Sequence, residues 1–482
     1  HPWLVKSTLQ FWFDVQDRNN GAIPREVRKI NLKSLWFPDH IRLGQPKKQN
    51  LTYANPYLLH WVAEFYYRYQ AGKVPLRFVL RVIQSIERYV SWVERTRSVR
   101  NAKGELIGFS TNALGSGLDN SRGSRGNRHE QGSERATWVD MLALQISMYK
   151  SLSRWTHRML VLKVEGADVP SGKNKWRLKC AAYRKKVSTL ERLLRTKYWN
   201  EKHAFFFDLV PTTPHGSWKQ DVRFHSIAGF WPLFSGSLSE AQLKMMVRRQ
   251  FQPRSFGGRF PFPANARHAL VSGDAKDDGY WDKWAHWPSM ATIVLHGLRK
   301  KRPGLAHKLS KRFLSAMSEV STQTVAEFYG EYKDKEGKIR PRIGQHGAHK
   351  TRLDFAGWGK VPPVLNMLHD VVGVQPLLRS VRGKVKRTSS RLQGHILWRI
   401  FPMRDGERLE VRNLAYAGKR IDKMILRKVR SGHYVVDVHA PMEIQFHFAL
   451  FEDKRGKRTQ STPMRKEERI GVGKQKQSII FF

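Results

Sequence analysis

The feature that most constrains this fold is a helical apolar period that returns in nine separate segments of the first 372 residues. In each segment apolar side chains recur at three- and four-residue spacing, which places them on one face of an α-helix. Loops separate the segments and no strand pattern lies between them, so the sequence predicts an all-helical toroid or solenoid rather than βαβ repeats. The segments are Leu4–Asp14, Pro56–Gln70, Val74–Arg97, Trp138–Trp155, Lys175–Lys197, Leu238–Arg249, Ser289–Lys300, Leu305–Val320 and Pro362–Val372.

One segment carries apolar residues on more than one face. Leu142, Leu144, Ile146 and Tyr149 cover several sides of the Trp138–Trp155 helix, so we expect this helix to be buried on two sides. The chain has 482 residues, of which 40% are hydrophobic. It is therefore long enough for a sizeable core and too apolar for global disorder.

The pattern changes after about residue 375. Short runs rich in β-branched and aromatic residues follow, separated by turns such as Arg404-Asp405-Gly406. We therefore predict a small C-terminal antiparallel β module over residues 376–450 and a basic, flexible tail over residues 451–482. The runs are Ile396–Pro402, Leu409–Leu414, Asp422–Val429, Tyr434–Val438 and Ile444–Leu450.

The charge of the chain is the most unusual part of its composition. Lys and Arg number 87 against 40 Asp and Glu, which gives a net charge of +47. A field of that sign attracts polyanions such as nucleic acid, anionic lipid surfaces or acidic polysaccharides. The basic residues are spread along the whole chain, so a solvated basic surface is the alternative interpretation.

Several kinds of site are excluded. The single cysteine, Cys180, rules out an intrachain disulfide, so it allows a reducing compartment without requiring one. No apolar run approaches the roughly 18 to 20 residues of a membrane span, and we expect a soluble protein of the cytoplasm or periplasm. The 19 histidines show no metal-ligand spacing and no phosphate-binding glycine loop occurs, so we expect no metal and no cofactor. The oligomeric state stays open.

Two acidic residues are candidates for hydrolytic chemistry. Asp119 follows Gly115-Ser116-Gly117-Leu118, a sequence that lets the backbone approach a ligand closely but is also typical of an ordinary turn. Glu327 is an acid among the apolar residues of Thr324–Tyr332; it has a raised pKa if it is buried, and is otherwise a helix-surface residue. The 16 tryptophans fit either a core or the stacking walls of a sugar site. Local chemistry leaves these alternatives open.

Both acids lie in motifs that resemble, in the same order, those of glycoside hydrolase family 63. That family holds processing α-glucosidase I and its bacterial relatives, including mannosylglycerate and glucosylglycerate hydrolases. The resemblance extends from about residue 20 to residue 360. The motifs are Asn20-Gly21-Ala22-Ile23-Pro24-Arg25-Glu26, Ala54-Asn55-Pro56, Ser116–Arg122, Trp138-Val139-Asp140, His225–Leu233, Gly279-Tyr280-Trp281-Asp282 through Trp287-Pro288, Glu327-Phe328-Tyr329 and Asp354–Trp358.

The resemblance implies a mainly α fold, an (α/α)6 toroidal barrel over residues 1–375 with the β module as its appendage. The family's Trp-Asp-x-Gly-Phe motif does not occur in this chain, which predicts a barrel without its first helices. The implied reaction is inverting hydrolysis of an α-linked glycoside that releases glucose or mannose, with Asp119 as general acid and Glu327 as general base.

The resemblance also implies a set of substrate-binding residues. Tyr280, Trp281, Trp287 and Trp358 fall where the family builds its sugar-binding walls. Arg25 and Glu26 fall at the pocket rim, where a structural ion pair is the alternative, and Asp140 is expected to orient a neighbour. The full set is Arg25, Glu26, Asn120, Trp138, Asp140, Trp231, Tyr280, Trp281, Trp287, Tyr329 and Trp358.

Two functions therefore compete. The first is a glycoside hydrolase whose carbohydrate substrate, given the basic field, is acidic. The second is a catalytically impaired glycosidase-like scaffold that binds nucleic acid or another anionic polymer through its basic surface. Hydrolysis that disappears on substitution of Asp119 and Glu327 indicates the first, and steeply salt-dependent nucleic-acid affinity without hydrolysis indicates the second.

Overall fold

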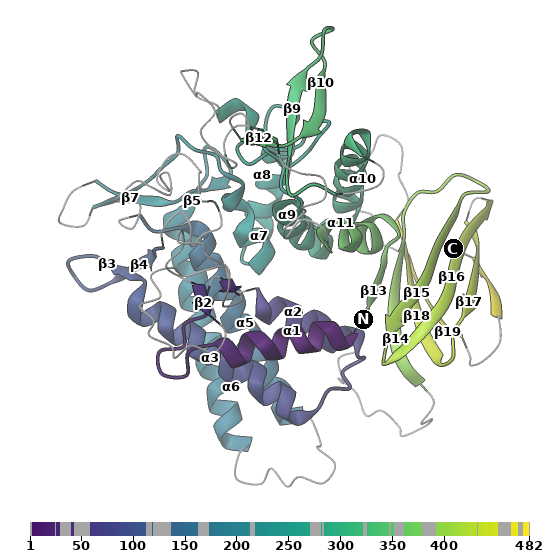
Figure 1. The fold of residues 1–482 in the computed structure, drawn as a ribbon, viewed down its shortest axis with the longest axis horizontal. Coiled ribbons are helices and arrows are strands. Elements are labelled where there is room, and N and C mark those ends of the chain that lie inside the picture. Colours follow the sequence, from purple (N-terminus) through teal and green to yellow (C-terminus); the bar gives the residue numbers. More distant parts are fainter. Residues whose placement is uncertain are drawn as a thin grey trace.

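The computed structural model contains a helical region followed by a C-terminal β module, which lie next to each other (Figure 1). All nine predicted helical segments coincide with helices, and most ends agree within three residues. The helices are α1 (Pro2–Val15), α2 (Leu59–Tyr69), α3 (Leu76–Thr96), α5 (Val139–Val161), α6 (Lys173–Leu193), α7 (Trp231–Ser235), α8 (Glu240–Gln250), α9 (Pro288–Lys301), α10 (Pro303–Val320) and α11 (Val361–Asn366), with short helical turns η3 (Leu194–Tyr198), η4 (Ile227–Phe230), η5 (Arg267–Ala269) and η6 (Met367–Val371).

The structure describes residues 2–24, 26–28, 40–42, 58–111, 118, 136–161, 173–212, 217–269, 281, 284–321, 325–346, 349–350, 361–377, 392–430, 432–451, 464–470 and 476–481. In this part of the chain, no helix is both long enough and apolar enough to cross a membrane. The closure of the helices into an (α/α)6 ring, and the loss of its first helices, stay predictions.

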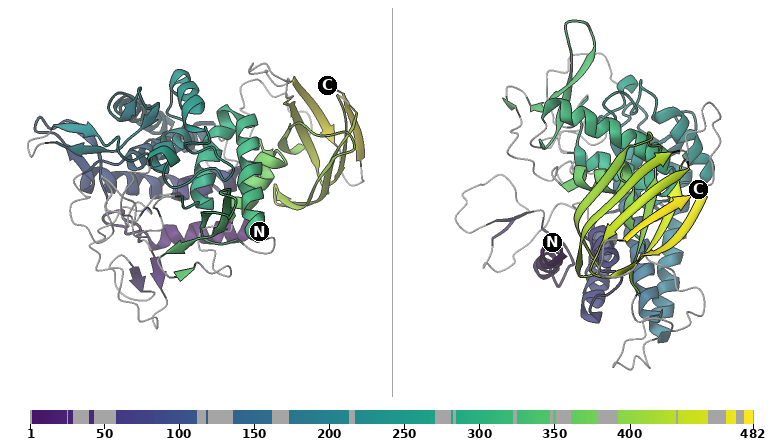
Figure 2. Two further views of the ribbon diagram at one scale, coloured as in Figure 1. Left: turned by 90° about the horizontal axis from the view of Figure 1, so that it is seen from above. Right: turned by 90° about the vertical axis from the view of Figure 1, so that its right-hand side faces the viewer.

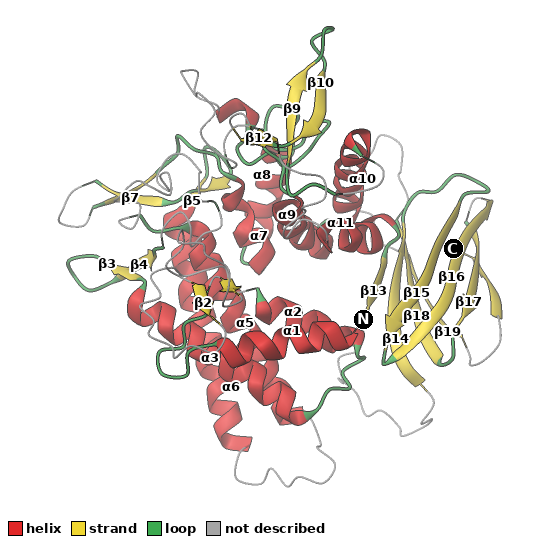
Figure 3. Cartoon of the chain, viewed as in Figure 1, coloured by secondary structure: helices red, strands yellow, loops and turns green. Residues whose placement is uncertain are grey.

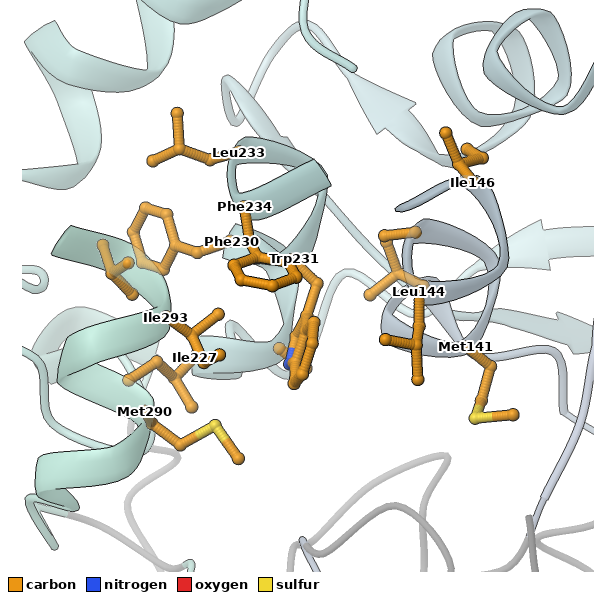
Figure 4. Packing of buried hydrophobic residues seen from close by; sticks show 14 of the residues in the cluster. Met141, Leu144, Ile146, Ile227, Phe230, Trp231, Leu233, Phe234, Met290 and Ile293 are labelled. Atoms are coloured by element: carbon orange, nitrogen blue, oxygen red, sulfur yellow. The ribbon is translucent and has the colours of Figure 1, made fainter. Parts of the chain in front are cut away.

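Helix α5 lies in the centre of the helical region and is buried on more than one side, as its sequence predicts. Every residue from Ala136 to Tyr149 is buried, and α5 packs against α3, α6 and α7. Helix α7 in turn packs between α5 and α9. Figure 4 shows this layer: Trp231 of α7 lies between Leu144 of α5 and Met290 of α9. One continuous hydrophobic core joins these helices.

Short strands interrupt the helical region, and the prediction that no strands lie between its helices was wrong. Most form hairpins with strands of two to five residues, which are too short to impose a two-residue apolar period on the sequence. The strands are β1 (Glu26–Arg28), β2 (His40–Arg42), β3 (Ser98–Arg100), β4 (Leu106–Phe109), β5 (Trp199–Asn200), β6 (Phe205–Phe206), β7 (Leu209–Pro211), β8 (Trp218–Gln220), β9 (Tyr329–Lys333), β10 (Ile339–Ile343), β11 (Gln345–His346) and β12 (His349–Lys350).

The C-terminal module is a sandwich of two four-stranded sheets, in the orders β13-β14-β18-β19 and β15-β16-β17-β20 (Figures 2 and 3). The five predicted strands are present, but β14 and β18 pair in parallel, so the prediction of a purely antiparallel module was wrong. Its core, separate from that of the helices, combines Trp398 and Phe446 of one sheet with Leu426 and Val436 of the other. The strands are β13 (Val374–Pro376), β14 (Leu392–Ile400), β15 (Arg408–Tyr416), β16 (Lys419–Arg430), β17 (His433–His439), β18 (Glu443–Leu450), β19 (Met464–Ile470) and β20 (Lys476–Phe481).

The module also extends beyond residue 450, which corrects the prediction of a flexible tail over residues 451–482. Strand β19 pairs with β18 and strand β20 pairs with β17, each at the edge of its sheet. Residues 464–470 read Met-Arg-Lys-Glu-Glu-Arg-Ile. Edge strands carry charged side chains because these oppose the edge-to-edge association of sheets. A solvated tail has a similar composition, so the sequence alone did not distinguish the two.

A buried polar network joins α9, η6 and α2 directly before the module begins. Arg299 of α9 donates to both carboxylate oxygens of Asp370, at 2.5 and 2.7 Å, and to Nδ1 of His369 at 3.0 Å. Nε2 of His369 lies 2.8 Å from the Tyr69 hydroxyl of α2. Directly after this network, Gly373 has a φ of +87°, and a Cβ there would lie 2.0 Å from the Arg399 carbonyl oxygen of β14. The connection is therefore tight at the backbone as well as in its side chains.

Candidate functional site

The predicted site residues divide into those that the structure describes and those outside the described residues. Outside are Arg25, Asp119, Asn120, Tyr280 and Trp358, and of Glu26 only the backbone is described, in β1. The predicted acid therefore has no structural description. The predicted base, Glu327, has one, together with six of the predicted substrate-binding residues.

Glu327 lies in the short segment that leads into β9, and it is partly exposed to solvent between two buried neighbours, Ala326 and Phe328. The segment is held at the backbone. His286 and Tyr329 exchange two backbone hydrogen bonds, of 2.7 and 2.9 Å. The Tyr329 hydroxyl also accepts a hydrogen bond from the backbone N–H of Ala326 at 3.0 Å. Glu327 is therefore a partly exposed acid on a rigid turn rather than the helix-surface residue of the alternative interpretation.

Next to Glu327 lies a stack of three aromatic rings. The rings of Trp281 and Trp287 are 4.1 Å apart and nearly parallel, at 7°. The ring of Phe328 continues the stack at 4.8 Å from Trp287 and 14°. Trp287 is the residue before Pro288, which begins α9, so the stack connects the start of this helix with the turn that carries Glu327. Two predicted sugar-wall residues thus contact Phe328, which follows the predicted base in the sequence.

A buried charged cluster lies behind this turn, and sequence reasoning missed it. The Glu331 carboxylate of β9 accepts from Arg267 at 2.5 Å, and Nε2 of His286 lies 3.2 Å from the same oxygen. Burial raises the pKa of Glu331, but His286 and the Arg267 guanidinium more than offset this, so the pKa stays below its usual value. The ring of His286 stacks on Phe260 at 3.9 Å. Because His286 also exchanges backbone hydrogen bonds with Tyr329, the cluster supports the geometry of the Glu327 turn.

The remaining predicted residues lie at the starts of two other helices. Trp231 begins α7 and is 2% exposed, and its indole N–H has no hydrogen-bond partner in the described part of the chain. Trp138 directly precedes α5 and is fully buried. The N-termini of α5, α7 and α9 thus carry Trp138, Trp231 and Trp287 respectively. Contact of these rings with a substrate stays a prediction.

Asp140 supports the start of α5 rather than standing free. Its carboxylate accepts a hydrogen bond from the backbone N–H of Met141 at 2.9 Å, and Asp208 accepts one from Val139 at 2.9 Å. Carboxylates at a helix N-terminus satisfy amide groups that have no partner within the helix. This local role agrees with the expectation that Asp140 orients its surroundings.

Two clefts of about 460 and 600 Å³ are lined by described residues, one by α3 and α6 and the other by α10 and the loop after α8. Neither is lined by a predicted site residue, so neither supports the sugar site. Among the described residues, no group of three or more His, Cys, Asp or Glu side chains is arranged to hold a metal ion.

Comparison with known proteins identifies one domain. Residues 176–349 match the family described as a mannosylglycerate hydrolase MGH1-like glycoside hydrolase domain. No curated protein sequence matches the chain. A solved sialidase structure is similar at a TM-score of 0.51 and 13% identity, over 89% of this chain and 33% of the sialidase chain, which shows a similar fold.

Two other solved structures are more weakly similar. Neutral trehalase Nth1 from Saccharomyces cerevisiae matches at a TM-score of 0.44 and 14% identity, over 58% of this chain and 59% of the trehalase. A family 63 mannosylglycerate hydrolase from Thermus thermophilus, solved in complex with glucose, matches at 0.45 and 14%, over 70% and 87%. This chain thus spans about three fifths of the trehalase and a third of the sialidase.

The matched residues include Glu327, the Trp281–Trp287–Phe328 stack and the Arg267–His286–Glu331 cluster. Residues 176–349 are therefore similar to a glycoside hydrolase domain of the MGH1-like type, in agreement with the resemblance to glycoside hydrolase family 63 predicted from the sequence.

Proposed function

We propose that this chain is an inverting glycoside hydrolase that releases glucose or mannose from an α-linked glycoside. The observation that carries the proposal is the position of Glu327, directly before the last ring of the aromatic stack and inside the domain that matches the family. A carboxylate beside an aromatic surface fits sugar hydrolysis, because the ring face packs on the apolar C–H face of a pyranose while the acid reaches its polar edge.

In the proposed reaction Glu327 is the general base. It takes a proton from a water molecule that attacks the anomeric carbon, while Asp119 donates a proton to the leaving oxygen on the opposite side of the sugar. Inversion requires room for that water, so the two carboxyl groups should stand about 6.5–9.5 Å apart. The hydrogen bonds that hold residues 326–329 support this role, because they fix the backbone of Glu327, which is partly exposed.

The net charge of +47 extends the proposal to the substrate, which we expect to be an acidic glycoside. A positive field raises the local concentration of anions and steers them to the protein at low ionic strength. Hydrolysis of an acidic α-glycoside should therefore slow as salt is added, and hydrolysis of a neutral one of similar size should change much less.

The test uses Glu327→Gln and Asp119→Asn with a panel of neutral and acidic α-glucosides and α-mannosides. Loss of a general acid or base typically lowers kcat by about 10²- to 10⁴-fold, and we expect a loss of that size for each variant. Glu336→Gln and Asp405→Asn are matched controls, since both side chains are exposed and lie in turns away from the stack. NMR of the first-formed product should show the β-anomer.

Two outcomes contradict the proposal. Full activity of both Glu327→Gln and Asp119→Asn would exclude these residues as the base and the acid. An α-anomeric first product would exclude an inverting mechanism. An inactive wild-type chain that binds an oligonucleotide with steep salt dependence instead supports the alternative of a glycosidase-like scaffold for an anionic polymer.

A further inference from the structure

Basic side chains from three helices meet at the end of the helical region that lies away from Glu327. They are Arg68 of α2, Lys150 and Arg154 of α5, and Lys300 of α9, which we call the basic cluster. Their charges are close enough to act on one another: Arg154, Arg68 and Lys150 each lower the pKa of Lys300, and Arg154 lowers the pKa of Arg68 and of Lys150. The cluster therefore concentrates positive charge at one place in the fold.

The lengths of the helices separate this cluster from the candidate sugar site. In α9, Lys300 stands thirteen residues after Trp287, which corresponds to about 20 Å of helix. In α5, Arg154 stands sixteen residues after Trp138, or about 24 Å. Helix α2 lies beside α5, with His60 bonded to Ser147 and Glu64 to Arg154. The basic cluster and the sugar site thus occupy opposite ends of the same helices.

The nearby carboxylates already have cationic partners. Glu64 is shared by Arg154, at 3.3 Å, and Arg158, at 2.9 and 2.8 Å. Glu191 lies 2.6 Å from Lys150 and 3.3 Å from Arg195. Among the described residues, Arg68 and Lys300 have neither a hydrogen bond nor an ion pair. The Glu64 charge also acts on Arg68, but it is shared with Arg154 and Arg158, so positive charge remains in excess in the cluster.

Arg68 and Lys300 are both accessible to solvent. His296 lies on the same helix, one turn before Lys300, and its buried Nδ1 has no hydrogen-bond partner in the described part of the chain. The centroid of the His296 ring lies 5.0 Å from that of Trp61 and 5.3 Å from that of Phe234, so aromatic side chains line the protein side of the cluster.

We propose that Arg68, Arg154 and Lys300 form a binding site for the phosphate group of a small ligand. The excess of cations over carboxylates favours an anionic ligand, and the Arg guanidinium offers paired N–H groups to the oxygens of a phosphate. Bound phosphate would supply the negative charge that the local carboxylates do not, and would favour the protonated form of Lys300. This site is independent of the proposed hydrolase activity, since its residues lie at the other end of α5 and α9.

The proposal is tested by isothermal titration calorimetry of the full chain with inorganic phosphate and with sulfate, at low ionic strength. The Arg68→Gln/Lys300→Gln double variant should bind both anions about tenfold or more weakly, because charged hydrogen bonds are lost. Arg77→Gln/Lys219→Gln is the matched control: it removes the same charge from exposed positions on α3 and β8 and should stay within about twofold of wild type.

Further arms separate the possible sources of the phosphate. Tighter binding of a hexose 6-phosphate than of inorganic phosphate indicates a phosphorylated sugar, and equal binding indicates free phosphate. Lys300→Arg keeps the positive charge and should retain phosphate binding. Retention in this variant would indicate that the double variant binds weakly because charge is lost, not because its fold is lost. Equal weakening in the control variant, absence of phosphate binding by wild type, or an effect of the double variant on heparin affinity alone would each overturn the proposal.

Discussion

The two ends of α9 are built from different interactions. At its start, Trp287 is sealed between Trp281 and Phe328, and the charged groups behind it are buried in a closed cluster. At its end, Arg299, Lys300 and Lys301 carry positive charge, which is favourable at a helix C-terminus, and Lys300 is open to solvent. The start is held by packing that salt does not weaken, whereas the end depends on electrostatic interactions that salt and pH change.

The largest effect should come from breaking the packed end. Trp287→Ala removes the middle ring of the stack and leaves a cavity, so we expect the free energy of unfolding to fall by about 3–5 kcal/mol. Trp287→Phe keeps an aromatic ring between Trp281 and Phe328 and should lose clearly less. Urea unfolding of both variants gives the comparison. Equal losses would show that an aromatic ring between Trp281 and Phe328 is not by itself what stabilises this end.

The second effect concerns the charged cluster behind the stack. Glu331→Gln leaves the Arg267 guanidinium buried, at a side-chain exposure of 10%, without a full counter-charge. Breaking a buried ion pair in this way typically costs about 3 kcal/mol or somewhat more. We expect the loss in urea unfolding to be nearly the same at low and at high salt. A loss that disappears in high salt would contradict the closed character of this end.

The third effect concerns Glu64, beside the basic cluster. Burial raises the pKa of Glu64, but Arg154 and Arg158 outweigh this and lower it from 4.5 to about 2. The folded-state value lies below the unfolded one, so Glu64 contributes stability above about pH 4.5 and loses it as the pH falls towards 2. At about 1.36 kcal/mol per pKa unit, the contribution is of the order of 3 kcal/mol.

Chemical unfolding of wild type and Glu64→Gln across this range measures that contribution. The two curves of stability against pH should be separated at pH 7 and should converge in acid. A separation that stays constant down to about pH 3 would contradict the assignment of the stabilising charge to Glu64.

The smallest effect should come from an exposed pair next to the end of α9. Arg302 pairs with Glu240, whose side chain is 61% exposed at the start of α8. Exposed pairs are typically worth about 0.2–1 kcal/mol, so Glu240→Gln should cost no more than about 1 kcal/mol, and less in high salt. A larger, salt-independent loss, measured by thermal unfolding, would show that this end is closed as well.

Local sequence patterns predicted most of the helices and five strands of the module, because long amphipathic or β-branched segments carry their own period. The edge strands were missed because Met464–Ile470 consists mostly of charged residues, which suit an edge as well as they suit a solvated tail. The β9–β10 hairpin was missed although Asp334, Glu336 and Gly337 form its turn.

The candidate site was predicted only in part, for a different reason. The motif order brought Glu327, Trp281 and Trp287 into one prediction, and the structure stacks the two tryptophans with Phe328, the neighbour of Glu327 in the sequence. The Arg267–Glu331 pair joins residues 64 positions apart, and no local pattern signals such a contact. Likewise Arg68, Arg154 and Lys300 are ordinary helix-surface charges in sequence, and their excess becomes visible only when the three helices are packed.

The network of Arg299, Asp370, His369 and Tyr69 bears on how such proteins can be recombined. Arg299 donates to Nδ1 of His369, so in the neutral ring the proton is on Nε2, facing the Tyr69 hydroxyl. A chain cut before Asp370 would leave Arg299 buried without its counter-charge. A chimera that grafts the sandwich onto another helical domain should therefore be joined after η6, so that Asp370 and His369 stay with Arg299 and Tyr69.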